Sequence, residues 1–477
     1  MAGLRVVHVI EQLRPGGPLV ALVGAAKNAD ADAPQEHRVV SLLSADSRAC
    51  RHSGQAGIDV VSAPSSGELR RELALADIVQ VHFWNSPVIH AWMATELPPL
   101  RVLAWCHVNG IHAPHILPRA LLEFADVVAM TSPRSLDLPV FAAAPPGRTE
   151  FVFAGADFSR IEGIAPAAHQ GVNVGYIGLV DFVKLHPAFV RMSAAVGLPY
   201  VRFLVCGGGN SRKDLQREAI SLDAIDRFEF FDHVEEIRPL LSRLDIFGYP
   251  LCPETSATSE LALQEAMYAG LPPVVFPHGG LDGLVTHARN GLVVATEIEY
   301  AQAIEFLCRR PEERLRLGAN AAADARSLFG ARRTASGMRS IYSRLMQLPK
   351  RPRTPGNSPT LEARPAAGAV ALLLSLDGIG DADLMASLTA DAAEASAAEV
   401  RIAAAGPNLR NVILQYRFRY ADDPHLRLWS GLLLAAAGRP ALAASEFKAS
   451  LELGLDHPRV RHYFSAVASP PCPQGLP

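Results

Sequence analysis

From residue 4 to about residue 330, short runs of β-branched residues alternate with longer runs rich in alanine and leucine. Several of the short runs are apolar on both faces rather than alternating, as expected for parallel strands covered by helices on both sides. Repetition of strand, helix and strand predicts doubly wound α/β sheets. The predicted strands cover residues 5–10, 38–43, 77–83, 101–107, 126–130, 173–178, 202–207, 228–232, 245–250 and 272–277.

Ten strands are too many for one compact sheet of this kind, and the periodicity is lost near residues 160–172. We therefore expect two Rossmann-like domains, residues 1–165 and residues 166–347. The following segment, residues 348–368, is rich in proline and polar residues and predicts a semi-rigid linker.

Beyond the linker the β-branched runs vanish, so residues 369–468 predict an all-α domain, followed by a disordered tail at 469–477. Residues 425–458 resemble a tetratricopeptide helical hairpin. The small and aromatic packing positions of that hairpin are filled by Gly431, Gly438, Ala443 and Phe447. A generic helical cap is an equally good interpretation. Both interpretations predict a contact surface for a protein partner rather than a catalyst.

Charge and cysteine usage exclude several classes of protein. The chain carries 45 basic and 48 acidic residues, a net charge of −3, which argues against a nucleic-acid partner. Its six cysteines are scattered without metal-ligand spacing, so we expect no metal and a reducing compartment.

Membrane and export signals are weak. The N-terminus lacks the features of a secretory signal, and the longest apolar run, residues 366–376, is well short of the ~20 residues that cross a bilayer. We expect a soluble cytoplasmic protein. Four arginines at 332–344 and the stretch KRPR at 350–353 raise membrane contact as an alternative, but a solvated helix face is the better interpretation.

Three loops that follow predicted strands carry residues suited to a ligand, because α/β enzymes place their sites at the C-terminal ends of strands. Gly16 and Gly17 precede a helix whose free N–H groups suit an anion. Lys184 follows the strand at 173–178 and suits a phosphate as a point charge. Gly207 and Gly208 begin a third loop. Plain turns and a solvated lysine remain alternatives for each loop.

A fourth region, residues 249–294, places Glu265 in the middle of an apolar helix. Burying an unpaired carboxylate costs several kcal/mol, so this residue needs a partner unless it lies on a wet stripe of the helix. The next strand leads to Gly279 and Gly280 and a further helix start. Two helix N-termini would then point into one crevice and suit a diphosphate. We predict that the partner of Glu265 is the ribose of a bound nucleotide.

In order along the chain, the motifs HVIEQLRPGG, DIVQVHFW, AGADFSRI, GYIGLVDFVK, VCGGG, FFDHV and PETSATSELALQEAMYAGLPPVV resemble those of a family-4 glycosyltransferase of the GT-B fold. The resemblance covers residues 1 to about 345. It implies two Rossmann-like domains facing a cleft. It also implies retaining transfer of a sugar from a UDP- or GDP-sugar donor to an acceptor hydroxyl, with no metal or other cofactor required.

The resemblance assigns roles to particular residues. The second domain would bind the nucleotide and the first the acceptor. Lys184 would hold the diphosphate, Glu265 the ribose, and His107 would lie near the transferred sugar; Lys184 and His107 are the catalytic candidates. The remaining substrate-binding candidates are Gly16, Gly17, Gly207, Gly208, Val234, Glu254, Glu260, Gly279 and Gly280.

The chain departs from the family pattern at three positions. Leu179 replaces an arginine, Ala257 replaces the first of two paired glutamates, and Gly283 replaces a turn glutamate. Two alternatives therefore stay open: a degenerate GT-B scaffold that works through its helical tail, and a relative such as a sugar-nucleotide 2-epimerase. We favour a transferase with an unusual donor or acceptor, because Lys184, Glu265 and the glycines are kept together.

Overall fold

The computed structural model describes residues 3–29, 34–353 and 367–468 of the 477-residue chain. Contacts between residues divide the chain into two compact units. The first comprises Met1–Phe83, Leu97–Ile111 and Leu121–Arg353, and holds two parallel sheets. The second comprises Trp84–Glu96, His112–Ala120 and Thr354–Pro477, and is helical where it is described.

The first sheet has seven parallel strands in the order β3-β2-β1-β4-β6-β7-β8. Its strands β4, β6 and β7 are buried at every position; β6 and β7 are apolar throughout, whereas β4 also buries Gln80 and His82. The strands are β1 (Leu4–Ile10), β2 (Gln35–Ser41), β3 (Asp59–Ser62), β4 (Ile78–Phe83), β6 (Val102–Cys106), β7 (Val127–Met130) and β8 (Thr149–Phe151). Its helices include α1 (Gly17–Lys27), α2 (Ser47–Gln55) and α3 (Ser66–Leu75).

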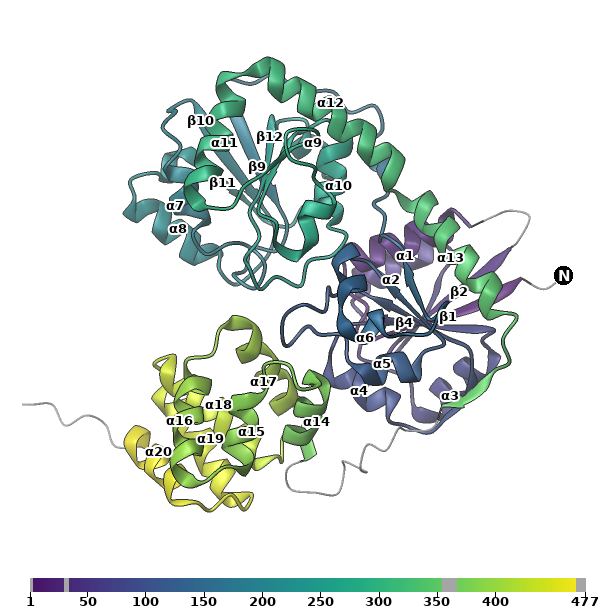
Figure 1. Ribbon diagram of the computed structural model, residues 1–477, viewed down its shortest axis with the longest axis vertical. Coiled ribbons are helices and arrows are strands. Elements are labelled where there is room, and N and C mark those ends of the chain that lie inside the picture. Colours follow the sequence, from purple (N-terminus) through teal and green to yellow (C-terminus); the bar gives the residue numbers. More distant parts are fainter. Residues whose placement is uncertain (1–2, 30–33, 354–366, 469–477) are drawn as a thin grey trace, which may run out of the picture. The chain divides into compact units, whose positions relative to one another are not determined.

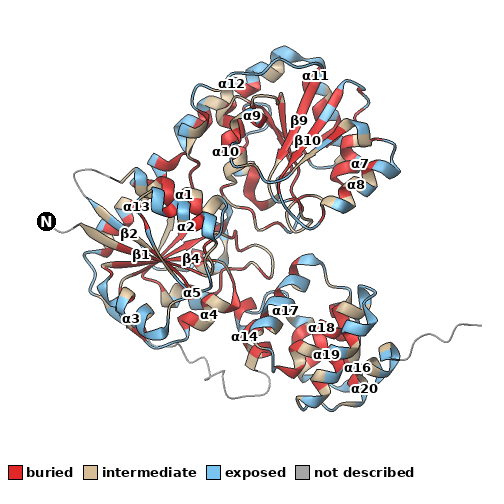
Figure 2. Cartoon of the chain, turned by 180° about the vertical axis from the view of Figure 1, so that it is seen from behind, coloured by how far each residue is buried: buried red, intermediate tan, exposed pale blue. Residues whose placement is uncertain are grey.

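The second sheet has six parallel strands in the order β11-β10-β9-β12-β13-β14. Figure 2 colours its central strands β9 and β10 as buried. The strands are β9 (Val172–Ile177), β10 (Val201–Cys206), β11 (Phe228–Phe231), β12 (Ile246–Tyr249), β13 (Pro273–Val275) and β14 (Leu292–Val293). Its helices are α7 (Phe189–Ala194), α8 (Arg212–Ser221), α9 (Arg238–Leu241), α10 (Leu261–Tyr268), α11 (Glu297–Arg309) and α12 (Pro311–Leu328).

Helix α13 (Ala331–Leu345) returns the chain to the first sheet and lies beside α1 (Figure 1). Its Met338 and Ile341 pack in one apolar cluster with Val6 and Trp105. The sequence placed these residues in the second domain, up to residue 347. The structure differs because the apolar face of α13 completes the core of the first sheet.

All ten predicted strands are present, and the described part of the chain contains five further strands that the sequence did not predict. The missed strands β3, β5 (Leu97–Leu100), β8, β14 and β15 (Arg351–Arg353) have two to four residues each, too few to show a period. Strand β15 pairs antiparallel with β5, although the sequence placed it in the linker. Arg353 forms a buried ion pair with Asp126, which holds this segment in place. The rest of the linker up to residue 366, and the tail at 469–477, lie outside the described residues.

The C-terminal region is helical, as predicted. The hairpin of α18 (Pro424–Ala436) and α19 (Pro440–Glu452) brings Gly431 against Phe447, where a Cβ on Gly431 would lie 2.5 Å from the ring. A glycine is therefore required for the close approach, while the likeness to a tetratricopeptide stays a prediction. The other helices are α14 (Ala367–Leu376), α15 (Ala382–Thr389), α16 (Ala392–Ala403), α17 (Pro407–Arg419) and α20 (Pro458–Ala468).

Two segments within the range predicted for the first domain belong to the helical unit instead. One contains α4 (Pro87–Met93) and the other is His112–Ala120. Asn85 Nδ2 donates to the carbonyls of Pro114 and Ser375 at 2.7 and 2.8 Å, and these bonds tie both segments to α14. No helix within residues 3–29, 34–353 and 367–468 has the length and hydropathy to span a membrane.

Candidate active site

The carboxyl ends of β9 and β12 meet at the centre of the second sheet. From β9 the chain winds outward to β10 and β11, whereas from β12 it winds the other way to β13 and β14. Ligands of open α/β sheets bind in the crevice at such a switch point. Tyr249 ends β12, and Lys184 lies in the loop after β9. The topology therefore selects this crevice as the candidate active site.

Lys184 is joined there to Glu260, another predicted site residue. Lys184 Nζ lies 2.7 Å from Glu260 Oε2, and the side chains are 25% and 9% exposed. The Tyr249 hydroxyl also donates to Glu260 Oε2, and the Thr258 amide donates to Oε1 at 3.2 Å. The ammonium expected to hold a diphosphate therefore holds a carboxylate of its own chain, so an incoming phosphate must displace or share it.

Glu260 is held in place by an unusual backbone conformation. It precedes α10 with φ 43° and ψ 77°, in the left-handed region. A residue other than glycine, asparagine or aspartate is rarely found there, and the conformation costs on the order of 1–3 kcal/mol. Such strain persists where the surrounding structure fixes it, and here it aims the carboxylate at Lys184.

Electrostatics keep Glu260 ionised. Burial alone raises the pKa of this carboxyl, but Lys184, the Tyr249 hydroxyl and the Thr258 amide together hold the pKa below its usual value. The Glu260 carboxyl that faces Lys184 is thus ionised at neutral pH.

Glu265 lies in the middle of α10 and is 8% exposed, as the apolar sequence predicts. Its Oε1 lies 3.7 Å from Arg160 Nη1, at ion-pair but not hydrogen-bond distance. Arg160 comes from the short 3-10 helix η2 (Phe158–Ile161) that precedes β9, and its other Nη donates to the Glu235 carbonyl. Burial raises the pKa of Glu265 to about 7, Arg160 opposes this and Asp157 adds to it.

Arg160 corrects part of the sequence interpretation, which left Glu265 without a protein partner. The correction is partial because a contact of 3.7 Å does not satisfy the hydrogen-bonding capacity of a carboxylate. The role of Glu265 toward a ribose stays a prediction.

Three polar side chains that the sequence did not single out tie α10 to the first sheet. Gln264 accepts from the Ala156 amide and donates to the Ala154 carbonyl. Ser259 accepts from the Ala154 amide and donates to the Thr131 carbonyl. Asn109, two residues after His107, donates to the carbonyls of Thr255 and Ala257. In the sequence, the signal for these contacts was Gln264, a glutamine in the apolar helix beside Glu265, because a buried side-chain amide needs hydrogen-bond partners.

The first glycine pair lies close to this helix. Gly16 caps α1, whose first residue is Gly17, and a Cβ on Gly17 would lie 3.4 Å from Leu261 Cδ1. The structure therefore brings the N-terminus of α1 next to the start of α10, beside Glu260.

The triple-glycine loop after β10 has a structural explanation of its own. A Cβ on Gly207 would lie 1.8 Å from the Gly178 carbonyl oxygen, so the loop after β9 excludes any side chain there. At Gly208 a Cβ would meet nothing within 4 Å. Packing thus explains Gly207 without a ligand, and Gly208 faces open space.

The second glycine pair does not begin an α-helix, which corrects the predicted second helix N-terminus. Residues His278–Gly283 form the 3-10 segment η4, interrupted by left-handed Gly279 and Gly280 at φ 65° and 83°. A Cβ on Gly279 would lie 2.8 Å from Ala257 Cβ. The pair therefore serves a tight turn, because β13 is followed by a compact corner rather than a helix.

The remaining candidates lie in different surroundings. Glu254 is exposed in the loop after β12. Val234 is partly buried against the core of the second sheet and lines a shallow pocket with Phe231 and Pro239. His107 directly follows β6, and its Nε2 lies 3.0 Å from His82 Nδ1. Burial lowers the pKa of His107 to about 3, so the ring is neutral.

The three positions that depart from the family pattern lie in different surroundings. Leu179 is 44% exposed, and Ala257 is buried against Gly279. Arg212, at the start of α8 after the triple-glycine loop, is engaged by Asp232 and the Phe230 carbonyl. Asp282, beside Gly283, pairs with Arg134.

Residues 184–324 match the family described as glycosyl transferases group 1. The match begins at Lys184 and ends in α12, so it contains Glu260 and Glu265. A curated relative, spore coat protein SA of Bacillus subtilis (strain 168), is 34% identical over 83 residues, 17% of this chain. The matched part is 22% of that relative, about a fifth of its length.

Solved structures establish the predicted GT-B fold. Anabaena Alr3699/HepE in complex with UDP and glucose superposes with a TM-score of 0.59 at 18% identity, over 72% of this chain and 100% of that one. Sucrose-phosphate synthase from Thermosynechococcus elongatus superposes with a TM-score of 0.57 at 17% identity, over 72% of this chain and 99% of that one. A glycosyltransferase from Rickettsia africae ESF-5 superposes with a TM-score of 0.56 at 12% identity, over 73% of this chain and 100% of that one. At these identities the likeness concerns the fold.

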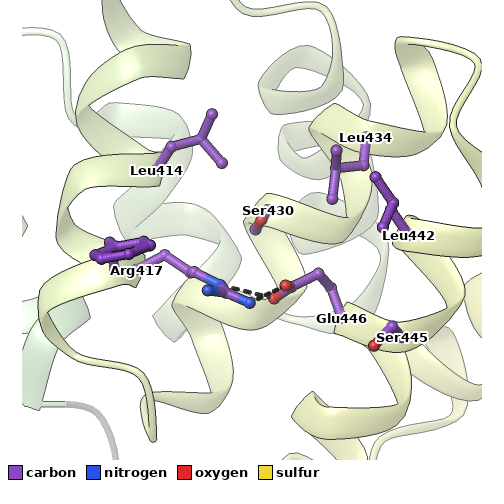
Figure 3. A pocket seen from close by; sticks show the side chains of 8 residues that line it. Leu414, Arg417, Ser430, Leu434, Leu442, Ser445 and Glu446 are labelled. Carbon is purple, nitrogen blue, oxygen red and sulfur yellow. Dashed lines mark hydrogen bonds and ion pairs between the residues drawn. The ribbon is translucent and has the colours of Figure 1, made fainter.

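The helical unit carries a separate pocket of about 500 Å³ between α17, α18 and α19. Figure 3 shows Leu414, Leu434 and Leu442 around it, with Arg417 and Glu446 paired across its floor. Arg417 Nε donates to Glu446 Oε2 at 3.0 Å. The pocket contains none of the residues predicted to bind a nucleotide sugar.

Proposed function

We propose that this chain is a retaining, metal-independent glycosyltransferase that moves a sugar from a nucleotide donor to an acceptor hydroxyl. The observation that carries the proposal is the partly buried Lys184 ammonium at the switch point of the second sheet. It lies in the segment that matches glycosyl transferases group 1. Two structures with this fold hold UDP and UDP-glucose, which supports a UDP-sugar as the first donor to test.

Each site residue has a defined task in this reaction. Lys184 stabilises the negative charge that grows on the leaving diphosphate, and the N–H groups at the start of α1 assist it. Glu265 accepts hydrogen bonds from the two ribose hydroxyls. The acceptor hydroxyl attacks from the face that the nucleotide leaves, so the configuration at the sugar carbon is retained. We assign no side chain as a nucleophile.

Glu260 competes with the donor for Lys184. We therefore expect Glu260→Gln to bind UDP about tenfold more tightly, equivalent to about 1.4 kcal/mol, because the neutral amide no longer neutralises the ammonium. Isothermal titration calorimetry with UDP measures this affinity. Glu162→Gln, which changes an exposed carboxylate, is the control and should leave the affinity unaltered. Weaker UDP binding by Glu260→Gln would show that Glu260 helps to hold the nucleotide.

The donor is tested with a panel of UDP- and GDP-sugars by thermal unfolding. A ligand present at 100 times its Kd stabilises the folded chain by about 2.7 kcal/mol, which raises the melting temperature. Glu265→Ala should weaken binding of the selected donor by about 10- to 100-fold, the equivalent of about 1.5–3 kcal/mol for hydrogen bonds to a charged group. Unchanged affinity in that variant would remove Glu265 from the nucleotide site.

A scaffold function through the helical unit is the second candidate, and the pocket at α17, α18 and α19 favours it. Phe418 at its edge is 83% exposed, which is unusual for an aromatic side chain. Stabilisation by a sugar nucleotide together with release of UDP would decide for the transferase. Failure of every donor in the panel would favour the scaffold.

A further inference from the structure

The helical unit carries its charges unevenly along the chain. Residues 367–400, which contain α14, α15 and α16, have six carboxylates and no lysine or arginine. Helix α17, which follows them, has three arginines and no carboxylate. The carboxylates are Asp377, Asp381, Asp383, Asp391, Glu394 and Glu399, and the arginines are Arg410, Arg417 and Arg419. An acidic part and a basic part are thus joined in one small unit.

The pocket between α17, α18 and α19, called here the α17–α19 pocket, exposes large apolar side chains at its rim (Figure 3). Phe418 is 83% exposed, and Leu414 and Leu442 are exposed beside it. The buried Ser430 lies in its wall. Large apolar side chains gathered around a hollow are typical of a surface that another molecule covers.

The floor of the α17–α19 pocket carries a net positive charge. Arg417 Nε donates to Glu446 Oε2 at 3.0 Å, and Arg427 Nη1 donates to the same oxygen at 3.2 Å. Two guanidinium groups therefore share one carboxylate. Arg410 is exposed one turn before Leu414, on the same stripe of α17. A complementary occupant therefore combines apolar side chains with carboxylates.

The hairpin of α15 and α16 exposes a surface of that kind. Each of its helices has a stripe of exposed residues at steps of three and four, and we call the two stripes together the α15–α16 face. Its members are Ala382, Met385, Thr389, Ala393, Ala397 and Val400. Val400 is 67% exposed, and the alanines around it leave room for a second helix to approach closely.

Carboxylates border the α15–α16 face. Asp381 and Asp391 precede the two helices, and the exposed Glu394 lies in the first turn of α16. Asp391 has a local task, because it accepts from two amides and caps α16. A helix N-terminus favours acidic residues in any case. That preference does not explain Val400, an apolar side chain exposed near the other end of the same helix.

We propose that the α17–α19 pocket receives the α15–α16 face of a second copy of this chain. Met385 and Val400 supply apolar side chains for a hollow of about 500 Å³, and the acidic border matches the arginines of α17. Both surfaces are exposed on the described part of one chain, so another copy can reach them.

The second copy is favoured over an unrelated acidic protein because every copy brings the complementary surface with it. The two surfaces consist of different residues, so the contact is head-to-tail. Such a contact can be divided between two variants, each of which keeps only one of the surfaces.

The test uses the full-length chain and two such variants. The pocket variant, Arg410→Glu with Phe418→Ser, loses the α17–α19 pocket and keeps the α15–α16 face. The face variant, Glu394→Gln with Val400→Ser, loses the face and keeps the pocket. All four positions are exposed and lie outside the apolar core of the helical unit, so the substitutions leave that core intact.

Analytical ultracentrifugation at roughly 100 µM chain, a concentration that reveals a Kd in the micromolar range, measures the association. We expect the parent protein to self-associate and each variant alone to associate at least about tenfold more weakly. An equimolar mixture of the variants should form a one-to-one complex, because each supplies the surface that the other lacks. Added salt should weaken this complex, since opposite charges face each other across it.

The matched control is Lys213→Glu with Ile220→Ser, which changes an exposed basic residue and an exposed apolar residue on α8. It should associate like the parent protein. A parent protein that stays monomeric would overturn the proposal and leave the pocket to a different partner. A mixture of the two variants that stays monomeric would also overturn it, as would association of either variant alone at the strength of the parent.

Discussion

Lys184→Ala should lower kcat for UDP-sugar turnover by about 10²- to 10³-fold, the range found when a single group that stabilises transition-state charge is removed. The loss should appear mainly in kcat, because the charge on the leaving diphosphate grows as the glycosidic bond breaks. Steady-state release of UDP measures turnover and calorimetry measures donor affinity, so the two experiments separate a loss of kcat from a loss of donor binding.

The Lys184→Ala variant also leaves the Glu260 carboxylate without its cation. Breaking a buried pair in this way costs about 3 kcal/mol, so a folding defect must be distinguished from a catalytic one. The double variant Lys184→Ala/Glu260→Gln removes both charges and should regain stability without regaining turnover. Lys213→Ala, at an exposed position on α8, is the matched control. Full turnover in the double variant would remove Lys184 from the mechanism.

Glu265→Gln should be more stable than the parent protein at pH 8, by roughly 3 kcal/mol, and equally stable near pH 4. The folded chain raises the pKa of this carboxyl from 4.5 to about 7, so it binds more protons than the unfolded chain between these values. Stability of the parent protein therefore falls as the pH rises through this window, and the neutral amide avoids that loss.

Urea unfolding of both proteins across pH 4 to 8 measures this difference, with Glu162→Gln as the control at an exposed position. If the free energy of unfolding changes with pH in the same way for the parent and for Glu265→Gln, the surroundings of Glu265 keep it stably ionised. The expected divergence would mean that the free protein keeps a carboxylate at a site where an amide is better tolerated. Selection for ligand binding explains such a residue better than selection for stability.

Long apolar runs carried most of the fold prediction. Strands such as β4 and β6 are buried on both faces, and their sequences are apolar enough to be recognised without any partner. Strands β14 and β15 were missed because two or three residues show no period, and only pairing with a neighbouring strand defines them. The placement of α13 on the first sheet was missed for a related reason, since periodicity identifies an apolar face but not the surface that it covers.

Local signals located the candidate site, and long-range pairs completed it. The burial of Glu265 followed from the sequence around it, whereas its contact with Arg160 joins residues far apart in the chain. The pair of Lys184 and Glu260 likewise depends on β9 and β12 being neighbours. The contact of His107 with His82 depends on strand register, which the sequence does not reveal until the strand order is known.

The return of α13 to the first sheet, and of β15 to its partner β5, has a consequence for biosynthesis. The strands of that sheet are complete at Phe151, but the helix that covers Trp105 and Val6 ends at Leu345 and the last strand at Arg353. At about 5–20 residues per second, a ribosome needs roughly 10–40 s to make the intervening chain. During that interval the domain of the first sheet lacks the helix that covers one of its apolar faces, while the domain of the second sheet forms a core of its own. Of the two domains that contain the parallel sheets, the one translated first is therefore the one whose core is completed last.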